Sequence, residues 1–106
     1  MELKGFQRSF LQKEAHHLKP TVNIGKNGFT DAIINAVSES LDNHELIKVK
    51  FVDFKDEKKE IAIQLAEKCN CSLVKLIGNI AILYKAKDDV QERQYHVPGS
   101  YSGENN

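Results

Sequence analysis

Apolar residues in this chain are spaced in two ways that alternate along its length. Helical spacing, with an apolar residue every three or four positions, covers three segments at residues 3–18, 31–43 and 56–69. Strand-like spacing covers four shorter segments at residues 21–24, 46–52, 73–77 and 80–85. The first spacing is typical of a helix with one buried face, and the second of a β-strand. The pattern therefore predicts the element order α-β-α-β-α-β-β.

Residues that start or stop regular structure lie between these segments. Pro20 disfavours helical geometry at the preceding residue and ends the first helix. Thr30 is the expected N-cap of the second helix, and Asp31 complements the helix dipole in its first turn. Asn70 is expected to end the third helix in a left-handed conformation, and Gly78-Asn79 is a two-residue hairpin signal.

Within the two long helices the apolar residues predict which side is buried. In the first helix the predicted stripe contains Leu3, Phe6, Phe10, Leu11, Ala15 and Leu18. In the second helix it contains Ala32, Ile33, Ala36, Val37, Ser40 and Leu41. In the strand at 46–52, Ile47, Val49 and Phe51 are expected to face one way, and Lys48 and Lys50 the other.

The order of elements predicts an α/β fold with α+β character. Strand-helix-strand units with short loops favour parallel pairing through right-handed crossovers, and the final hairpin adds an antiparallel strand. We therefore expect a mixed four-stranded sheet packed with helices. At 106 residues the chain has room for one domain, which we assign to residues 1–86. Residues 87–106 are mostly polar and are expected to form a mobile tail, although Tyr95, Val97 and Tyr101 could dock.

Composition excludes several classes of protein. Apolar residues make up 41% of the chain and charged residues 28%, as in an ordinary globular protein. No run approaches the roughly 20 apolar residues that span a bilayer, and the first residues lack the apolar region of a secretory signal. We expect a cytoplasmic monomer that does not associate with membranes.

Cys69 and Cys71 form a lone C-x-C pair near the start of a strand. A zinc site needs about four ligands, and no second pair or suitably spaced histidine accompanies these two. Neighbouring strand positions also point to opposite faces, which disfavours a mutual disulfide. We expect two reduced cysteines, no metal and no cofactor.

The formal net charge is zero, but the charges are unevenly distributed. Residues 1–28 carry five lysines and arginines against two glutamates, a net charge of +3. Residues 86–106 carry a net charge of −2. Because local field matters more for binding than total charge, the N-terminal third could still hold a polyanion.

The loop Gly25-Lys26-Asn27-Gly28 links a predicted strand to a predicted helix. Its glycines let backbone amides approach a ligand, and the following helix offers unpaired amides and the positive end of its dipole. Lys26 adds a mobile cation. This arrangement is suited to a phosphate, although G-x-x-G is also found in ordinary turns that bind nothing.

Further basic and polar residues could support this loop. The polar side of the first helix carries Arg8, Lys13 and His16, and Lys19 follows that helix. Lys48 and Lys50 share one side of the strand at 46–52, where contact with a polyanion and a purely solubilising role are equally open.

Several of these stretches together resemble a known family. They are Ala15-His16-His17-Leu18-Lys19-Pro20, the 24–28 loop, His44 to Lys50, and Ile77-Gly78-Asn79 followed by Leu83-Tyr84-Lys85. Over about residues 3–85 the chain resembles the CRM domain (chloroplast RNA splicing and ribosome maturation) in its stand-alone bacterial YhbY-type form. It departs from that pattern at Lys4, where a capping Thr is expected, and at Phe6 and Gln12, where basic residues are common.

The resemblance implies a fold similar to the C-terminal domain of translation initiation factor 3. It also implies a non-catalytic RNA-binding protein associated with rRNA in precursors of the large ribosomal subunit. The RNA-contacting loop would then be Gly25, Lys26, Asn27 and Gly28. With the residues chosen on physical grounds, the candidate RNA-binding set is Gly25, Lys26, Asn27, Gly28, Lys19, Lys13, Arg8, His16, Thr30, Lys48 and Lys50.

Two alternatives remain open. The loop could instead hold the phosphate of a nucleotide, although it is too short for a Walker A loop and lacks the Lys-Ser/Thr end that holds Mg²⁺. No grouping of Ser, His, Asp or Cys indicates a catalytic site. The chain could also act as a protein adaptor through the outer sheet face or the acidic tail.

Overall fold

The computed structural model describes residues 2–99, and within them the predicted order of helices and strands is confirmed. The helices are α1 (Gly5–Glu14), α2 (Asp31–His44) and α3 (Lys58–Lys68), with short 3₁₀ turns η1 (Lys55–Glu57) and η2 (Val90–Glu92). The strands are β1 (Val22–Ile24), β2 (Leu46–Phe51), β3 (Ser72–Ile77) and β4 (Ile80–Tyr84).

The four strands form one mixed sheet in the order β1-β2-β4-β3. β1 pairs with β2 in parallel, and α2 makes the crossover between them, as the strand-helix-strand pattern predicts. β4 pairs antiparallel with both β2 and β3. The final strand thus inserts between β2 and β3, which leaves β1 and β3 as the two edges of the sheet.

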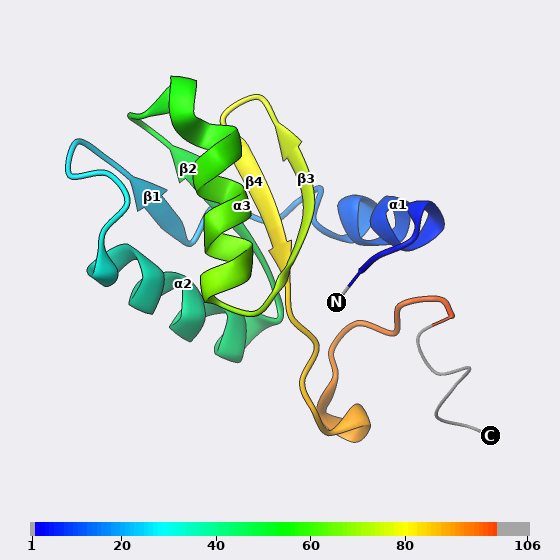
Figure 1. Ribbon diagram of the computed structural model, residues 1–106. Coiled ribbons are helices and arrows are strands. Elements are labelled where there is room, and N and C mark those ends of the chain that lie inside the picture. Colours follow the sequence, from blue (N-terminus) through cyan, green and yellow to red (C-terminus); the bar gives the residue numbers. More distant parts are fainter. Residues whose placement is uncertain (1, 100–106) are drawn as a thin grey trace.

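Helices cover the two faces of the sheet unequally. α2 and α3 lie together on one face, whereas α1 lies on the other face toward the β3 edge (Figure 1). The core between the sheet and α2 and α3 includes Val37, Leu41, Ile47, Val49, Phe51, Leu65 and Leu83. A second, smaller core beneath α1 includes Leu11, Ala15, Leu46, Val74, Ile82 and Tyr84. Part of the sheet on the α1 side is therefore left without a covering helix.

The first helix is shorter than the sequence pattern predicts, because α1 ends at Glu14 and not near Leu18. After Ala15 the chain continues in tight turns that bring the carbonyl groups of His16 and Leu18 toward the sheet. The ammonium group of Lys48 donates to both carbonyls, at 3.2 Å and 2.9 Å. These carbonyl groups bond to a strand residue in place of continuing the helix, which the local sequence could not reveal.

The predicted apolar stripes are also only partly buried. In α1, Phe6 is 54% exposed, and its ring lies against Gly99. In α2, Ala32 and Ala36 are exposed, while Val37, Ser40 and Leu41 are buried. α2 packs beside β1, an edge strand, so a narrower stripe than predicted faces the sheet.

Local signals at the element ends agree with the sequence. Thr30 caps α2 by accepting a hydrogen bond from the Ile33 amide at 3.2 Å, and Asn70 has the expected positive φ of 51°. Gly78 has a φ of 56° in the β3–β4 hairpin, a conformation that a glycine adopts without steric cost. Both cysteines are free, as expected.

The chain after β4 packs against α1 over its described part. Val97 is 3% exposed within the α1 core, and Tyr95 packs beside it. The buried carboxylate of Glu45 accepts hydrogen bonds from the amides of Lys87 at 2.9 Å and Gln94 at 2.5 Å. Tyr95 and Val97 therefore dock, an outcome that the sequence left open. Tyr101 lies outside the described residues, and mobility of the tail in solution stays a prediction.

Candidate nucleic-acid interface

The Gly25-Lys26-Asn27-Gly28 loop is a tight turn at the end of β1. The Gly28 amide donates to the Gly25 carbonyl at 2.9 Å, so this amide is used inside the loop and is not available to a ligand. Gly28 has a φ of 73° and is buried, whereas Lys26 and Asn27 are exposed. The turn thus projects its two central residues into solvent.

Several amides around the exposed turn have no internal partner. Within residues 2–99, no group accepts a hydrogen bond from the amides of Lys26, Asn27, Asp31 or Ala32. The first two lie at the turn and the last two in the first turn of α2. Unpaired amides at a helix N-terminus carry partial positive charge, which favours an anion. The loop, the N-terminus of α2 and the Lys26 ammonium group together have the chemistry of a phosphate site.

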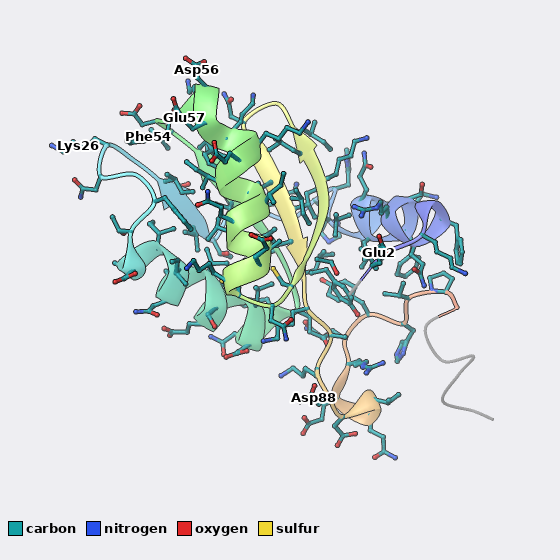
Figure 2. All side chains as sticks on the ribbon, viewed as in Figure 1. Glu2, Lys26, Phe54, Asp56, Glu57 and Asp88 are labelled. Carbon is teal, nitrogen blue, oxygen red and sulfur yellow. The ribbon has the colours of Figure 1, made fainter. Side chains whose placement is uncertain are left out.

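Phe54 packs against Gly28 of the loop, a role that the sequence pattern did not reveal. A Cβ atom built at Gly28 would lie 2.9 Å from Cζ of the Phe54 ring, so ring and glycine are in direct contact. Figure 2 shows Phe54 beside the loop that carries Lys26, with Asp56 and Glu57 on the same side of the molecule. The available signal was one aromatic residue within the otherwise polar stretch 53–60. The two carboxylates make the field at the loop less positive than the sequence count of residues 1–28 suggests.

The polar side of α1 forms a second group of candidate residues. Ser9, Gln12, Lys13 and His16 line a shallow depression along the helix, and Lys13 and His16 are exposed. Arg8 is different, because its guanidinium group donates to the carbonyl groups of Leu73 and Val74, the latter at 2.9 Å. These carbonyls lie at an irregularity in the β3–β4 pairing. Arg8 thereby fixes α1 to the sheet and is not directed freely to solvent.

The two lysines of β2 and Lys19, which lies between α1 and β1, are in different surroundings. Lys50 is exposed on the α1 side of the sheet, whereas Lys48 is partly buried and bonded to the two carbonyls at the end of α1. Lys19 is exposed before β1, at the opposite end of that strand from the glycine loop. The candidate residues are therefore spread over α1, the segment before β1, β2 and the glycine loop, and they do not form a single cluster.

The uncovered part of the sheet connects the two groups. On the α1 side, strand pairing aligns Asn23 with Lys50, Lys50 with Ile80, and Ile80 with Ile77. This row starts two residues before Gly25 and ends at the β3 edge, where α1 lies. Three inter-strand spacings make it roughly 14 Å long. We call the face that carries this row, together with Lys48, Ile82 and Lys75 of the neighbouring row, the open sheet face.

The acidic residues at 88–92 lie far from the glycine loop. Figure 2 shows Asp88 at the opposite end of the molecule from Lys26. Asp88, Asp89 and Glu92 border a depression near the C-terminal end of α2, beside Asp42. Lys26 and the acidic group at 88–92 thus lie at different ends of the fold, so the net charge of zero does not by itself argue against a polyanionic ligand.

The two cysteine thiols have raised pKa values. Burial raises the pKa of the Cys71 thiol to about 12, and burial also raises the pKa of Cys69. Among residues 2–99, no group of three or more His, Cys, Asp or Glu residues could hold a metal ion. Over the same range, no helix is both long enough and apolar enough to cross a bilayer.

Known proteins share this fold and sequence pattern. The family model of the CRS1/YhbY (CRM) domain matches residues 3–85. The chain is 36% identical to "Probable RNA-binding protein YqeI" of Bacillus subtilis, over 91% of this chain and 99% of the relative. It is 35% identical to a Haemophilus influenzae protein named "RNA-binding protein", over 80% and 87% of the respective chains.

A solved structure agrees with these matches. The solution structure of Staphylococcus aureus protein SAV1595, a candidate RNA-binding protein, superimposes with a TM-score of 0.77 at 33% identity. The similarity covers 92% of this chain and all of that one. The match over residues 3–85, the relatives of similar length and the shared fold together show that this chain belongs to the CRS1/YhbY (CRM) domain family of RNA-binding proteins.

Proposed function

We propose that this protein binds rRNA in precursors of the large ribosomal subunit as a non-catalytic assembly factor. Its phosphate-binding element is the Gly25–Gly28 loop with the N-terminus of α2. The observation that carries the proposal is the set of unpaired amides at Lys26, Asn27, Asp31 and Ala32 beside an exposed lysine. The resemblance to stand-alone bacterial YhbY-type proteins supports the choice of rRNA.

In this mechanism the loop recognises the sugar-phosphate backbone. Backbone amides donate to phosphate oxygens, and the Lys26 ammonium group neutralises part of their charge. Such contacts fix the position of an RNA strand but do not distinguish its bases. Lys13, Lys19 and Lys50 add positive charge along the path between the loop and α1, and His16 adds a hydrogen-bonding side chain.

The loop mechanism is tested by charge reversal at Lys26. Lys26→Glu should weaken binding to rRNA fragments irrespective of sequence, because it replaces a phosphate contact with a repulsive charge. It should also flatten the salt dependence, which is about −0.7 log units of affinity per log unit of salt for each phosphate neutralised on a single strand. The measurement is fluorescence anisotropy of a labelled rRNA fragment at several salt concentrations.

Lys68→Glu is the matched control. Lys68 is exposed in the last turn of α3, and its reversal changes the net charge by the same amount. α3 begins beside Phe54, so Lys68 lies roughly 15 Å further along the helix axis. Equal salt dependence and equal affinity of Lys26→Glu and wild type would contradict the mechanism. Equal losses in the two variants would reduce it to non-specific charge attraction.

The ribosomal assignment requires a separate experiment in cell lysate. A tagged full-length protein should co-sediment with immature large subunits at low salt, and Lys26→Glu should shift it toward the free-protein fractions. Sedimentation of the wild-type protein only as free protein at low salt would oppose this assignment. Calorimetric titration with nucleotides tests the alternative of a small phosphate ligand, and micromolar binding would favour it.

A further inference from the structure

A pocket on the open sheet face lies between α1 and the β3–β4 hairpin. It has a volume of about 230 Å³ and is lined by Gln12, His16, Lys48, Ile77, Ile80 and Ile82. Its floor is aliphatic, whereas its α1 wall is formed by an amide and an imidazole side chain. Ile82 and Ile80 belong to or pack against the core beneath α1, so the pocket floor is continuous with that core, whereas the phosphate contacts at the loop do not require the pocket.

Hydrogen bonds from two cationic side chains position the elements around the pocket. Lys48 Nζ bonds to the His16 carbonyl at 3.2 Å and so ties the end of α1 to the middle of β2. Arg8 fixes the same helix to the carbonyl groups of β3. Two cations are thus used to hold α1 at a set distance from the strands, and the pocket occupies the resulting space.

Ile77 forms an exposed aliphatic rim of the pocket. Ile77 is 45% exposed at the end of β3, and it continues the aliphatic floor formed by Ile80 and Ile82. Apolar surface next to hydrogen-bonding groups fits a ligand with an apolar face and a polar edge. A nucleobase has this form, and bases that leave a stack are held between apolar faces with hydrogen bonds at their edges.

The charges around the pocket favour an anionic ligand. Lys48 lines it, Lys50 and Lys75 lie in the adjoining cross-strand rows, and Lys13 is exposed on the neighbouring helix surface. None of the residues that line the pocket or form these rows carries a carboxylate. RNA carries one negative charge per nucleotide, so it complements these lysines more regularly than an acidic or neutral protein segment does.

From the aliphatic floor, the polar wall and the basic surroundings, we propose that this pocket holds one unpaired nucleobase of the RNA whose backbone contacts the Gly25–Gly28 loop. This inference rests on the proposed function and adds a ligand preference to it. The base site lies at the α1 end of the open sheet face, and the phosphate site lies beyond the β1 end of the same face. The protein therefore prefers RNA with unpaired nucleotides over a duplex, in which bases are stacked and inaccessible.

Ile77→Thr tests the pocket without disturbing the core. The side chain is exposed, and threonine retains the β-branched shape that suits a strand. Ile63→Thr is the matched control, since Ile63 is 44% exposed on α3, in the layer on the other side of the sheet. The full-length proteins are titrated with a short unstructured RNA, with the same RNA carrying abasic nucleotides, and with a duplex of the same sequence.

The wild type should bind the unstructured RNA more tightly than either the abasic strand or the duplex. Ile77→Thr should weaken binding of the intact strand roughly three- to tenfold, since aliphatic contact contributes less than aromatic stacking. It should leave binding of the abasic strand unchanged, and Ile63→Thr should change neither. In methyl NMR spectra, Ile80 and Ile82 should show ring-current shifts with the intact strand and not with the abasic strand.

Failure of this inference can be distinguished from failure of the proposed function. If Lys26→Glu weakens binding but Ile77→Thr and abasic substitution do not, phosphate binding stands and the base pocket is refuted. If the wild-type protein binds none of the three RNAs, the proposed function fails and the pocket fails with it. If Ile77→Thr loses a protein partner from lysate while its RNA affinities stay unchanged, the pocket is a protein-docking site and the inference is refuted.

Discussion

The two glycines of the loop should respond in opposite ways to the same substitution. At Gly28, φ is 73° and a new Cβ would lie 2.9 Å and 3.0 Å from two carbons of the Phe54 ring. At Gly25, no atom lies within 4 Å of a new Cβ. Alanine is therefore strained and crowded at position 28 and unhindered at position 25.

The expected loss for Gly28→Ala has two parts. Holding a non-glycine residue in the left-handed region costs about 1–2 kcal/mol. Overlap with a packed ring costs about 1–3 kcal/mol, with the lower value if Phe54 swings aside. The free energy of unfolding should therefore fall by roughly 2–5 kcal/mol, a large fraction of the ~5–15 kcal/mol typical of a domain. Gly25→Ala should be neutral or slightly stabilising.

Urea denaturation followed by far-UV circular dichroism measures both variants. A change in midpoint at constant slope reports the change in stability. The double variant Gly28→Ala/Phe54→Ala separates the two parts, because removal of the ring relieves the overlap and leaves the backbone strain. The double variant should thus be more stable than the sum of the single losses predicts, with a coupling of about 1–3 kcal/mol. Equal stability of Gly28→Ala and Gly25→Ala would refute the assignment of Gly28 as a buried, left-handed position against Phe54.

Four further predictions test other parts of the structure. Arg8→Met should destabilise the protein by about 1–3 kcal/mol, since two carbonyl groups lose a charged donor, and urea denaturation against exposed Lys13→Met as control checks this. Glu45→Ala removes the acceptor of two tail amides and should speed tryptic cleavage after Arg93, whereas unchanged cleavage would mean that the carboxylate does not hold the tail. Burial, together with the carboxylates of Glu14 and Glu45, raises the pKa of Tyr95. Docking of the neutral phenol should therefore be complete below pH ~10, the pKa of tyrosine in the unfolded chain, and should weaken as the pH rises above that value. NMR of the Val97 methyl groups follows this change. The pH dependence should disappear in Tyr95→Phe. Cys71, with its pKa raised from 9.0 to about 12, should react with iodoacetamide at pH 8 far more slowly than a free thiol, and an equal rate would contradict the effect of its partial burial.

The hydrophobic pattern was sufficient to predict the helices, the strands and their order. Helical and strand periodicities are local properties, and the caps at Thr30 and Asn70 act within a few residues, so both can be found without a structure. The parallel pairing of β1 and β2 also follows from sequence, because a helix between two strands restricts how they can pair. The loop at Gly25–Gly28 was identified for the same reason, since its glycines and Lys26 are adjacent in the chain.

Tertiary structure alone decided which of these residues are free to act. Lys48 and Arg8 look like surface cations in the sequence, yet both bond to carbonyl groups of distant elements. Phe54 gains its role from contact with Gly28, and Val97 from burial beside α1. Such contacts join positions far apart in the chain and depend on how the layers pack, which no local pattern encodes. The open sheet face exists for the same reason: α1 covers only part of the sheet, and its position was set by side chains from β2 and by carbonyl groups of β3.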